Sequence, residues 1–270
     1  MSRLFVGNMF KSNWTKNEIT IISDLTKSAK DIQLITGRSI SSIQHKRSRL
    51  GLNYRLYQEN LRVNVNFFKT ESPDMLYILG FIAADGCVRI DKKGRNILSI
   101  ELSDKDIDHL YKIRDLLSCV NKIYINKDNF NKTRARLIIC SKKIVSDLIK
   151  LGIIPRKSLI LKWPNISDKY ISHFIRGYMD GDGCIKYNFK RTSPSVSFAG
   201  TYKFLSTIKD KLLILLNVSG SLYKDGNIYG LDYSCNQSIK VLDFLYYNSN
   251  IYLIRKFNRY MYIKKGGEYV

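Results

Sequence analysis

The chain has 270 residues, of which 45 are Lys or Arg and 23 are Asp or Glu, so its formal charge is +22. An excess of this size repels itself and predicts an anionic partner, with nucleic acid as the first candidate. No apolar run approaches the ~18 residues that a membrane helix needs, and no signal-peptide layout opens the sequence. We therefore expect an intracellular protein that acts wherever its nucleic acid lies.

The first predicted elements are short helices within residues 1–52. An amphipathic stretch begins at Trp14-Thr15, and for the last helix of the group Ser39 suits the N-cap and Gly51 the end. Three side chains of that last helix are expected to face its core: Ile40, Ile43 and Leu50. Four are expected to face outward: His45, Lys46, Arg47 and Arg49.

This pattern of Trp-Thr, Gly-Arg-Ser and Arg-Leu-Gly-Leu resembles homeodomain-like helix-turn-helix modules over about residues 12–52. The resemblance implies that the third helix enters the DNA major groove and that its outward side chains contact DNA. A small helical cap on the rest of the protein is the alternative. Residues 53–72 are expected to be a polar linker, whose tether would raise the effective concentration of the module beside its partner's site.

An internal repeat organises the rest of the chain. Leu79–Cys87 matches Arg176–Cys184 at an offset of 97 residues, and Lys157 matches Lys256 at an offset of 99. Two further segments match, Ser99–Leu102 with Ser195–Phe198 (offset 96) and Cys140–Ile144 with Cys235–Ile239 (offset 95). The repeat predicts two structural halves, residues 73–165 and 166–270, joined near Trp163-Pro164-Asn165, where proline interrupts any helix.

Each half predicts the same order of elements. An apolar helix ends at Gly86 or Gly183, and two strands with period-two alternation follow. A helix comes next (about 104–118 and 201–217), then two more strands, then a closing helix (141–151 and 236–247). The exposed strand faces are mainly basic, and Arg can pair with guanine edges and Asn with adenine, although any of these residues could contact only phosphate. The candidate DNA contacts there are Arg89, Arg95, Arg134, Arg136, Lys186, Asn188, Lys190 and Arg191.

Small residues predict that the two repeated helices pack against each other. Gly80 and Ala84 lie four residues apart, as do Gly177 and Gly181, so each pair shares one helix face. Close packing there brings Asp85 beside Asp182, each at the negative end of a helix dipole. A divalent cation would relieve this repulsion, and oxygen ligands suit Mg²⁺, with Mn²⁺ as a substitute. The candidate metal ligands are Asp85, Asp182, Ala84 and Gly181.

The two motifs, Leu79–Gly86 and Arg176–Gly183, resemble the paired signatures of single-chain LAGLIDADG homing endonucleases, over about residues 73–262. The first motif departs from the family pattern because Ala83 replaces an acidic residue. The family's metal-binding acids are the downstream ones, here Asp85 and Asp182, so Asp180 is expected to be structural.

This resemblance implies an α+β fold of two αββαββα halves about a pseudo-twofold axis, beside the all-α N-terminal module. It implies a monomer whose saddle-shaped antiparallel sheets lie in the DNA major groove. It also implies Mg²⁺-dependent hydrolysis of both strands that leaves short 3′ overhangs. Lys157 and Lys256 match a basic residue of the family and would stabilise transition-state charge, with ordinary surface lysines as the alternative.

Two other functions use the same core. One is a transcription regulator that kept the fold and lost cleavage, and two intact motif acids argue against it. The other is a maturase that binds intron RNA. The sequence favours the endonuclease and leaves the target DNA undefined.

Overall fold

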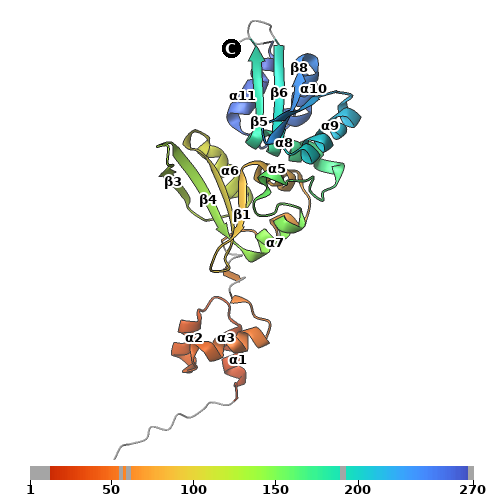
Figure 1. Ribbon diagram of the computed structural model, residues 1–270. Coiled ribbons are helices and arrows are strands. Elements are labelled where there is room, and N and C mark those ends of the chain that lie inside the picture. The colour runs from red at the N-terminus through yellow and green to blue at the C-terminus, as the bar shows by residue number, and fades with distance from the viewer. Residues whose placement is uncertain (1–12, 55–56, 59–61, 189–192, 267–270) are drawn as a thin grey trace, which may run out of the picture. The chain divides into compact units, whose positions relative to one another are not determined.

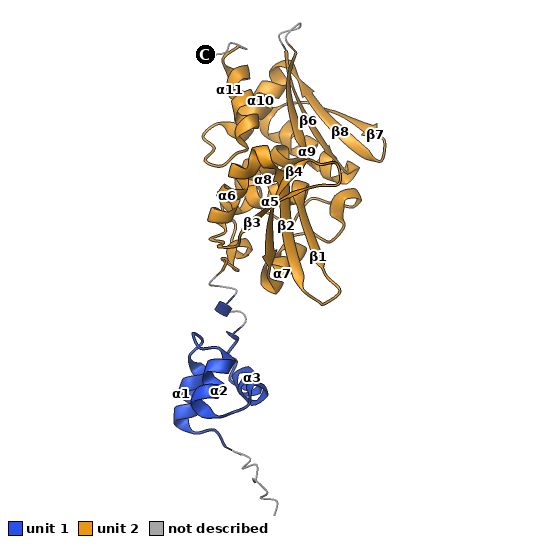
Figure 2. Ribbon diagram, turned by 90° about the vertical axis from the view of Figure 1, so that its left-hand side faces the viewer, with its two compact units in different colours: residues 1–61 blue, residues 62–270 orange. Residues whose placement is uncertain are grey.

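The structure is a computed structural model that describes residues 13–54, 57–58, 62–188 and 193–266. The chain divides into two compact units, residues 1–61 and 62–270 (Figure 2). Within the described ranges, no helix is both long enough and apolar enough to cross a membrane.

Unit 1 contains three short helices, α1 (Lys16–Ser23), α2 (Ala29–Thr36) and α3 (Ile40–Arg49). Each begins at a hydroxyl N-cap, Thr15, Ser28 or Ser39, whose side chain accepts a backbone N–H of the first turn. The predicted N-cap at Ser39 is confirmed. Among the described residues of this unit, the buried apolar core consists of Ile22, Ile32 and Ile43, with Trp14, Ile21 and Ala29 packed against it. Leu50, expected in this core, is 41% exposed, so that expectation was wrong.

Unit 2 begins earlier than the sequence suggests. Val63, Val65 and Phe68 are buried in the same apolar core as the first motif helix, and a 3-10 turn, η1 (Phe67–Lys69), lies among them. The expected linker over 53–72 is therefore wrong from residue 62 onward, because apolar residues of that segment pack into the core.

The first half of unit 2 runs α5 (Pro73–Asp85), β1 (Gly86–Ile90), β2 (Asn96–Ser103), η2 (Asp104–Asp106), α6 (Ile107–Leu116), β3 (Ile123–Lys127), β4 (Thr133–Cys140), α7 (Lys142–Lys150) and η3 (Lys157–Leu159). The second half runs η4 (Asp168–Tyr170), α8 (Ile171–Asp182), β5 (Gly183–Asn188), β6 (Ser193–Gly200), α9 (Tyr202–Leu216), β7 (Ser221–Asp225), β8 (Ile228–Ser234), α10 (Cys235–Tyr246) and α11 (Ile254–Lys264). The predicted order of elements is confirmed in the first half, and in the second half α11 follows the helix that was expected to be the last (Figure 1).

The two sheets have the same antiparallel topology, β1-β2-β4-β3 and β5-β6-β8-β7. On one face of the first sheet, alternate residues such as Val88, Leu98 and Ile139 are buried. Helices α6 and α7 pack against the strands of this sheet, and α9 and α10 pack against those of the second. The opposite face of each sheet carries polar residues, such as Arg89 and Glu101 in the first and Lys186 and Ser195 in the second.

Strand pairing corrects two of the repeat offsets. Gly86 pairs with Ile100 and Gly183 with Phe198, so the second strands correspond at 98 residues rather than 96. Ile100 then pairs with Leu137 and Phe198 with Leu231, which places the fourth strands at 94 rather than 95. The first strand offset, 97, stands.

Candidate functional site

Helices α5 and α8 cross at two glycines. A Cβ atom on Gly80 would overlap the carbonyl oxygen of Phe174, and one on Gly177 would overlap that of Tyr77. These two contacts are equivalent under the 97-residue repeat, so the backbones approach each other symmetrically. The expected backbone-to-backbone packing is confirmed. It brings the C-terminal ends of the helices together, because a Cβ on Gly181 would lie 3.3 Å from Asp85 Oδ2.

The carboxyl groups of Asp85 and Asp182 lie at these two helix ends and influence each other. Burial and, after it, the negative charge of Asp182 together raise the pKa of Asp85 from 3.8 to about 6. The pKa of Asp182 is also raised by loss of hydration, while the positive charges of Lys157 and Lys256 oppose that shift. Two carboxylates that repel each other at the negative ends of two helices form a site that favours a cation.

The donor set at this site consists of oxygen atoms. Across the described residues, no group of three or more His, Cys, Asp or Glu side chains is placed to hold a metal ion. Among the described residues, the carboxylates of Asp85 and Asp182 and the carbonyl oxygens of Ala84 and Gly181 lie at the ends of α5 and α8. Such a sparse set of hard oxygen ligands fits Mg²⁺, which keeps several waters and accepts phosphate oxygens.

Lys157 and Lys256 lie against the same helix ends. Lys157 Nζ donates to the carbonyl oxygens of Ala84 (3.1 Å) and Gly86 (2.7 Å). Lys256 Nζ donates to Gly181 (3.3 Å) and Gly183 (2.6 Å), the residues equivalent to Ala84 and Gly86, and also to Met179 and Asp180. The two side chains are 6% and 4% exposed, so the alternative that they are ordinary surface lysines is wrong.

The two lysines therefore make equivalent hydrogen bonds in the two halves, because each donates to carbonyl oxygens that correspond in the repeat. Each ammonium group donates to carbonyl groups at a helix end, where intrahelical donors run out, and its positive charge is favourable at the negative end of the helix dipole. Burial lowers the pKa of Lys256 to about 8, while the charges of Asp180 and Asp85 oppose the shift. Burial also lowers the pKa of Lys157. Because a carbonyl oxygen has two lone pairs, the carbonyls of Ala84 and Gly181 can accept from lysine and still face a cation.

Asp180 is buried and serves as an acceptor inside the protein. Its side chain is 1% exposed and accepts hydrogen bonds from Tyr77 Oη (2.6 Å), Tyr246 Oη (2.6 Å) and Leu253 N (2.8 Å). The expectation that Asp180 is structural and not a metal ligand agrees with this burial. Tyr77 belongs to α5, so this network also ties the two halves together.

Sequence reasoning gave no role to three members of this interior, Tyr77, Tyr246 and Arg176. Arg176 is 2% exposed, and its guanidinium donates to the carbonyl oxygens of Ile251 (3.0 Å) and Leu245 (2.9 Å) and lies over the Tyr77 ring at 5.2 Å. The available signal was an arginine inside an otherwise apolar motif helix, where a buried charge requires partners.

The exposed sheet faces carry most of the candidate DNA contacts. Arg89 and Lys186 occupy equivalent positions in β1 and β5, and both are exposed, as is Asn188. Three other arginines are held by carboxylates: Arg95 by Asp91, Arg134 by Asp128 and Arg136 by Glu101. Their side chains remain 58%, 40% and 47% exposed, so these ion pairs leave them accessible to a ligand. Lys190 and Arg191 lie outside the described residues.

In unit 1 the structure separates one arginine from the other candidate contacts. Arg47 is 4% exposed, and its guanidinium donates to the carbonyl oxygens of Ile22 (2.8 Å), Asp24 (2.8 Å) and Lys27 (2.9 Å). The expectation that Arg47 faces outward was wrong, because it joins α3 to the turn between α1 and α2. His45 and Arg49 are exposed as expected, and Lys46 is half-buried.

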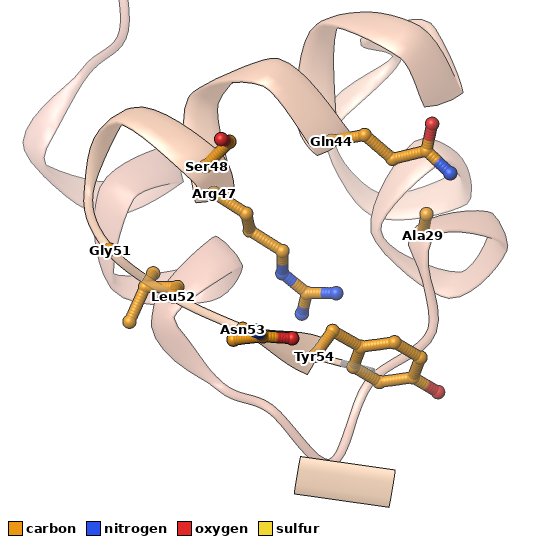
Figure 3. Close-up of a pocket in the computed structure, with 8 residues that line it drawn as sticks. All are labelled: Ala29, Gln44, Arg47, Ser48, Gly51, Leu52, Asn53 and Tyr54. Atoms are coloured by element: carbon orange, nitrogen blue, oxygen red, sulfur yellow. The ribbon is translucent and has the colours of Figure 1, made fainter. Parts of the chain in front are cut away.

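A pocket of about 490 Å³ lies beside Arg47 (Figure 3). It is lined by Ala29, Gln44, Arg47, Ser48, Gly51, Leu52, Asn53 and Tyr54. The Arg47 guanidinium lies 4.9 Å from the centre of the Tyr54 ring. With its carbonyl partners and this ring, Arg47 is a structural cross-link and not a candidate DNA contact.

Residues 72–151 match the sequence model of the LAGLIDADG-like domain. This range begins at the N-cap of α5 and ends directly after α7, so it spans most of the first half. The second half is related to it by the internal repeat described above.

The chain is also similar to several solved structures. One is the LAGLIDADG meganuclease I-AabMI bound to uncleaved DNA, with 16% identity and a TM-score of 0.48 over 73% of this chain and 90% of that one. Another is the I-LtrWI LAGLIDADG homing endonuclease bound to target DNA, with 13% identity and a TM-score of 0.48 over 74% and 89%. Mesophilic variants of the homing endonuclease I-DmoI match with 18% identity and a TM-score of 0.47 over 67% and 92%.

Proposed function

We propose that this protein is a site-specific homing endonuclease that hydrolyses both strands of a long DNA duplex with Mg²⁺ and leaves short 3′ overhangs. The observation that carries the proposal is the pair of acids at one helix crossing. Asp85 and Asp182 come from separate halves, interact through their charges, and are each accompanied by a buried lysine. The LAGLIDADG-like domain over residues 72–151 supports the same function.

The roles of the residues follow from their positions. Asp85 and Asp182 would hold Mg²⁺, with the carbonyl oxygens of Ala84 and Gly181 beside them. When bound, Mg²⁺ would supply an activated water and neutralise charge on the leaving oxygen. Lys157 and Lys256 would place positive charge near the negative charge that develops on each scissile phosphate. One acid and one lysine in each half suit a substrate with two scissile phosphates.

The exposed sheet faces would read the duplex. Arg89 and Lys186 hold equivalent places on the two faces and are positioned for phosphate or guanine contacts. Arg136 keeps its side chain 47% exposed while Glu101 orients its guanidinium, which lowers the entropic cost of a base contact. Unit 1, through His45, Lys46 and Arg49, would add contacts beside the cleavage site. The protein would act as a monomer on the DNA of its cell.

The test begins with duplexes selected from a random DNA library by binding to the full chain in EDTA. A selected duplex is then cloned into a supercoiled plasmid, and Mg²⁺ or Mn²⁺ is added. We expect linear product with 3′ overhangs, no product in EDTA, and no product for Asp182→Asn. Asp225→Asn, which removes the same charge at a hairpin turn of the second half, is the matched control and should still cut.

Each other outcome identifies a different function. Tight, selective binding without cleavage in either cation would contradict the endonuclease and favour a transcription regulator. Rescue of intron splicing in vitro without DNA cleavage would favour a maturase. Failure to enrich any duplex would contradict DNA recognition itself.

A further inference from the structure

The network around Asp180 is connected to the segment that carries Lys256. Leu253 donates its backbone N–H to Asp180 Oδ2 at 2.8 Å and is the N-cap residue of α11. Lys256 lies three residues later, and its own backbone N–H donates to Leu253 O at 3.0 Å. The Lys256 ammonium then returns to α8 and donates to the carbonyl oxygen of Asp180 at 2.8 Å. Asp180 therefore fixes both the start of the lysine's helix and one acceptor of its amine.

Tyr246 holds the opposite side of the same carboxylate. Its hydroxyl donates to Asp180 Oδ1 at 2.6 Å from the last turn of α10, while Tyr77 of α5 donates to Oδ2. All three donors converge on a side chain with almost no access to water, where an unmade hydrogen bond is costly. The carboxylate therefore has one preferred orientation. Because Leu253 N–H donates to it, that orientation also fixes the position of the segment from Leu253 to Lys256.

The first half lacks the parts of this network. At the 97-residue offset, Ala83 stands where the second half has Asp180, and Leu79 where it has Arg176. Tyr77 corresponds to Phe174, which has no hydroxyl. Lys157 lies in the 3-10 turn η3 after Arg156, a residue with φ of 58°, and its amine has two carbonyl acceptors within the described residues, where that of Lys256 has four. The two lysines thus lie at equivalent positions, but different contacts hold the segments that carry them.

From this asymmetry we infer that Asp180 is a positioning residue for Lys256 alone. Removing its carboxylate disables cleavage of one DNA strand, while the other strand is still cleaved. The inference rests on the proposed endonuclease function, because it assigns one lysine to each scissile phosphate. A merely structural role for Asp180 would weaken both halves together, since Tyr77 joins the network from the first half. Selectivity between Lys256 and Lys157 distinguishes the two roles.

The first test needs no DNA. The full chain in EDTA is treated with an amine-acetylating reagent, and the labelling rates of Lys157 and Lys256 are measured by mass spectrometry. Asp180→Ala, which installs the residue of the first half, should raise the rate at Lys256 by about 10-fold or more, as expected for loss of a charge-assisted hydrogen bond. The rate at Lys157 should stay within about 2-fold of its original value, well below that effect. Asp180→Asn should retain most of the protection, because its amide oxygen can still accept from Leu253 N–H.

The second test follows cleavage of a selected duplex labelled separately on each strand. Asp180→Ala should slow cleavage of one strand by roughly 10- to 100-fold, because a small displacement of an active-site group has an effect of this size. Nicked duplex should therefore accumulate during the reaction. Tyr246→Phe should also slow cleavage of the same strand, but by a smaller factor. Tyr260→Phe is the matched control, because its hydroxyl donates to Asp243 at 2.9 Å and not to Asp180.

Equal acceleration of labelling at both lysines, or none at Lys256, would overturn the inference, as would equal slowing of both strands. If Asp180→Ala does not fold, Tyr246→Phe decides, and unchanged Lys256 labelling in that variant overturns the inference. A wild-type chain that cuts no duplex would contradict the proposed function, while selective exposure of Lys256 would still establish that Asp180 positions it.

Discussion

Single arginines hold unit 1 together. Among its described residues the fully buried apolar core is small, with Ile22, Ile32 and Ile43 at its centre, so polar contacts add to the stability that burial supplies. Arg38 lies 4.7 Å from the centre of the Trp14 ring and forms an ion pair with Glu18 at 2.9 Å, and Arg47 joins α3 to the preceding turn. Two arginines of this basic unit are thus committed to its fold rather than to a ligand.

Replacing Arg47 should therefore affect stability first. Arg47→Ala leaves three buried or half-buried carbonyl groups without their donor and should destabilise unit 1 by about 2 kcal/mol or more. Denaturation followed by Trp14 fluorescence in a Trp163→Phe background measures this, since the chain has two tryptophans. Arg49→Ala is the control and should change stability by less than about 0.5 kcal/mol while weakening DNA binding. Equal stability of the two variants would contradict this role of Arg47.

The Glu18 ion pair predicts acid sensitivity of the same unit. Hydrogen bonds from Arg38 lower the pKa of Glu18 from 4.5 to about 2. A carboxyl group with a lowered folded-state pKa stabilises the fold above its unfolded pKa, and this stability is lost as pH falls from about 4.5 toward 2. In the same fluorescence assay, Glu18→Gln should reduce the loss of unfolding free energy that the unit shows as pH falls through this range. The remainder belongs to Asp24 and Asp31, whose pKa values are also lowered by hydrogen bonds.

The burial of Arg47 could have been predicted from the sequence. Polar side chains were assigned to the solvent face of the last helix, yet Arg47 follows Ile43 by four residues and so lies on the same face. That spacing was a usable signal. The carbonyl partners of Lys157 and Lys256 had no comparable signal, because they depend on how distant segments meet the helix ends.

Among the elements of unit 2, the pair α5 and α8 depends on its glycines most directly. Gly177→Ala would place a methyl group against the Tyr77 carbonyl and 2.8 Å from Phe81 N, both backbone atoms that cannot move aside. We expect a loss of about 3 kcal/mol in chemical denaturation of unit 2, because overpacking against backbone forces the helices apart. Gly94→Asn is the control, since Gly94 has a φ of 73° and open space around it, and asparagine tolerates that conformation. Similar denaturation midpoints for both variants would contradict the close packing.

The order of elements in each half was predictable, and the register of the strands was not. Alternating residues and glycine-bounded helices indicated the helices and strands of each half in order, except α11, the helix that carries Lys256. The matched segments at offsets 96 and 95 were nevertheless displaced, because the real offsets, 98 and 94, follow from strand pairing. Connections of different length separate the strands in the two halves, so local similarity cannot fix the register.

At the scale of the whole molecule, both units carry an excess of positive charge. Residues 1–61 carry ten Lys and Arg against four Asp and Glu, which leaves 35 against 19 for residues 62–270. Most of the positive excess therefore belongs to unit 2, where exposed strand residues such as Arg89 and Lys186 lie on the polar sheet faces. Under the proposed function, the basic side chains of unit 1 would add to the DNA contacts that unit 2 makes.

This distribution predicts how DNA affinity depends on salt. If the full chain contacts about 6–10 phosphates, its affinity for a selected duplex should fall about 10³- to 10⁵-fold between about 50 and 200 mM salt. A chain reduced to residues 62–270 should bind more weakly, with a slope of log affinity against log salt shallower by about 0.9 for each phosphate that unit 1 contacts. Fluorescence anisotropy in EDTA measures both slopes. Identical slopes would mean that unit 1 contacts no phosphate, and a flat response of the full chain would contradict an extended DNA surface, because counterion release accompanies every phosphate contact.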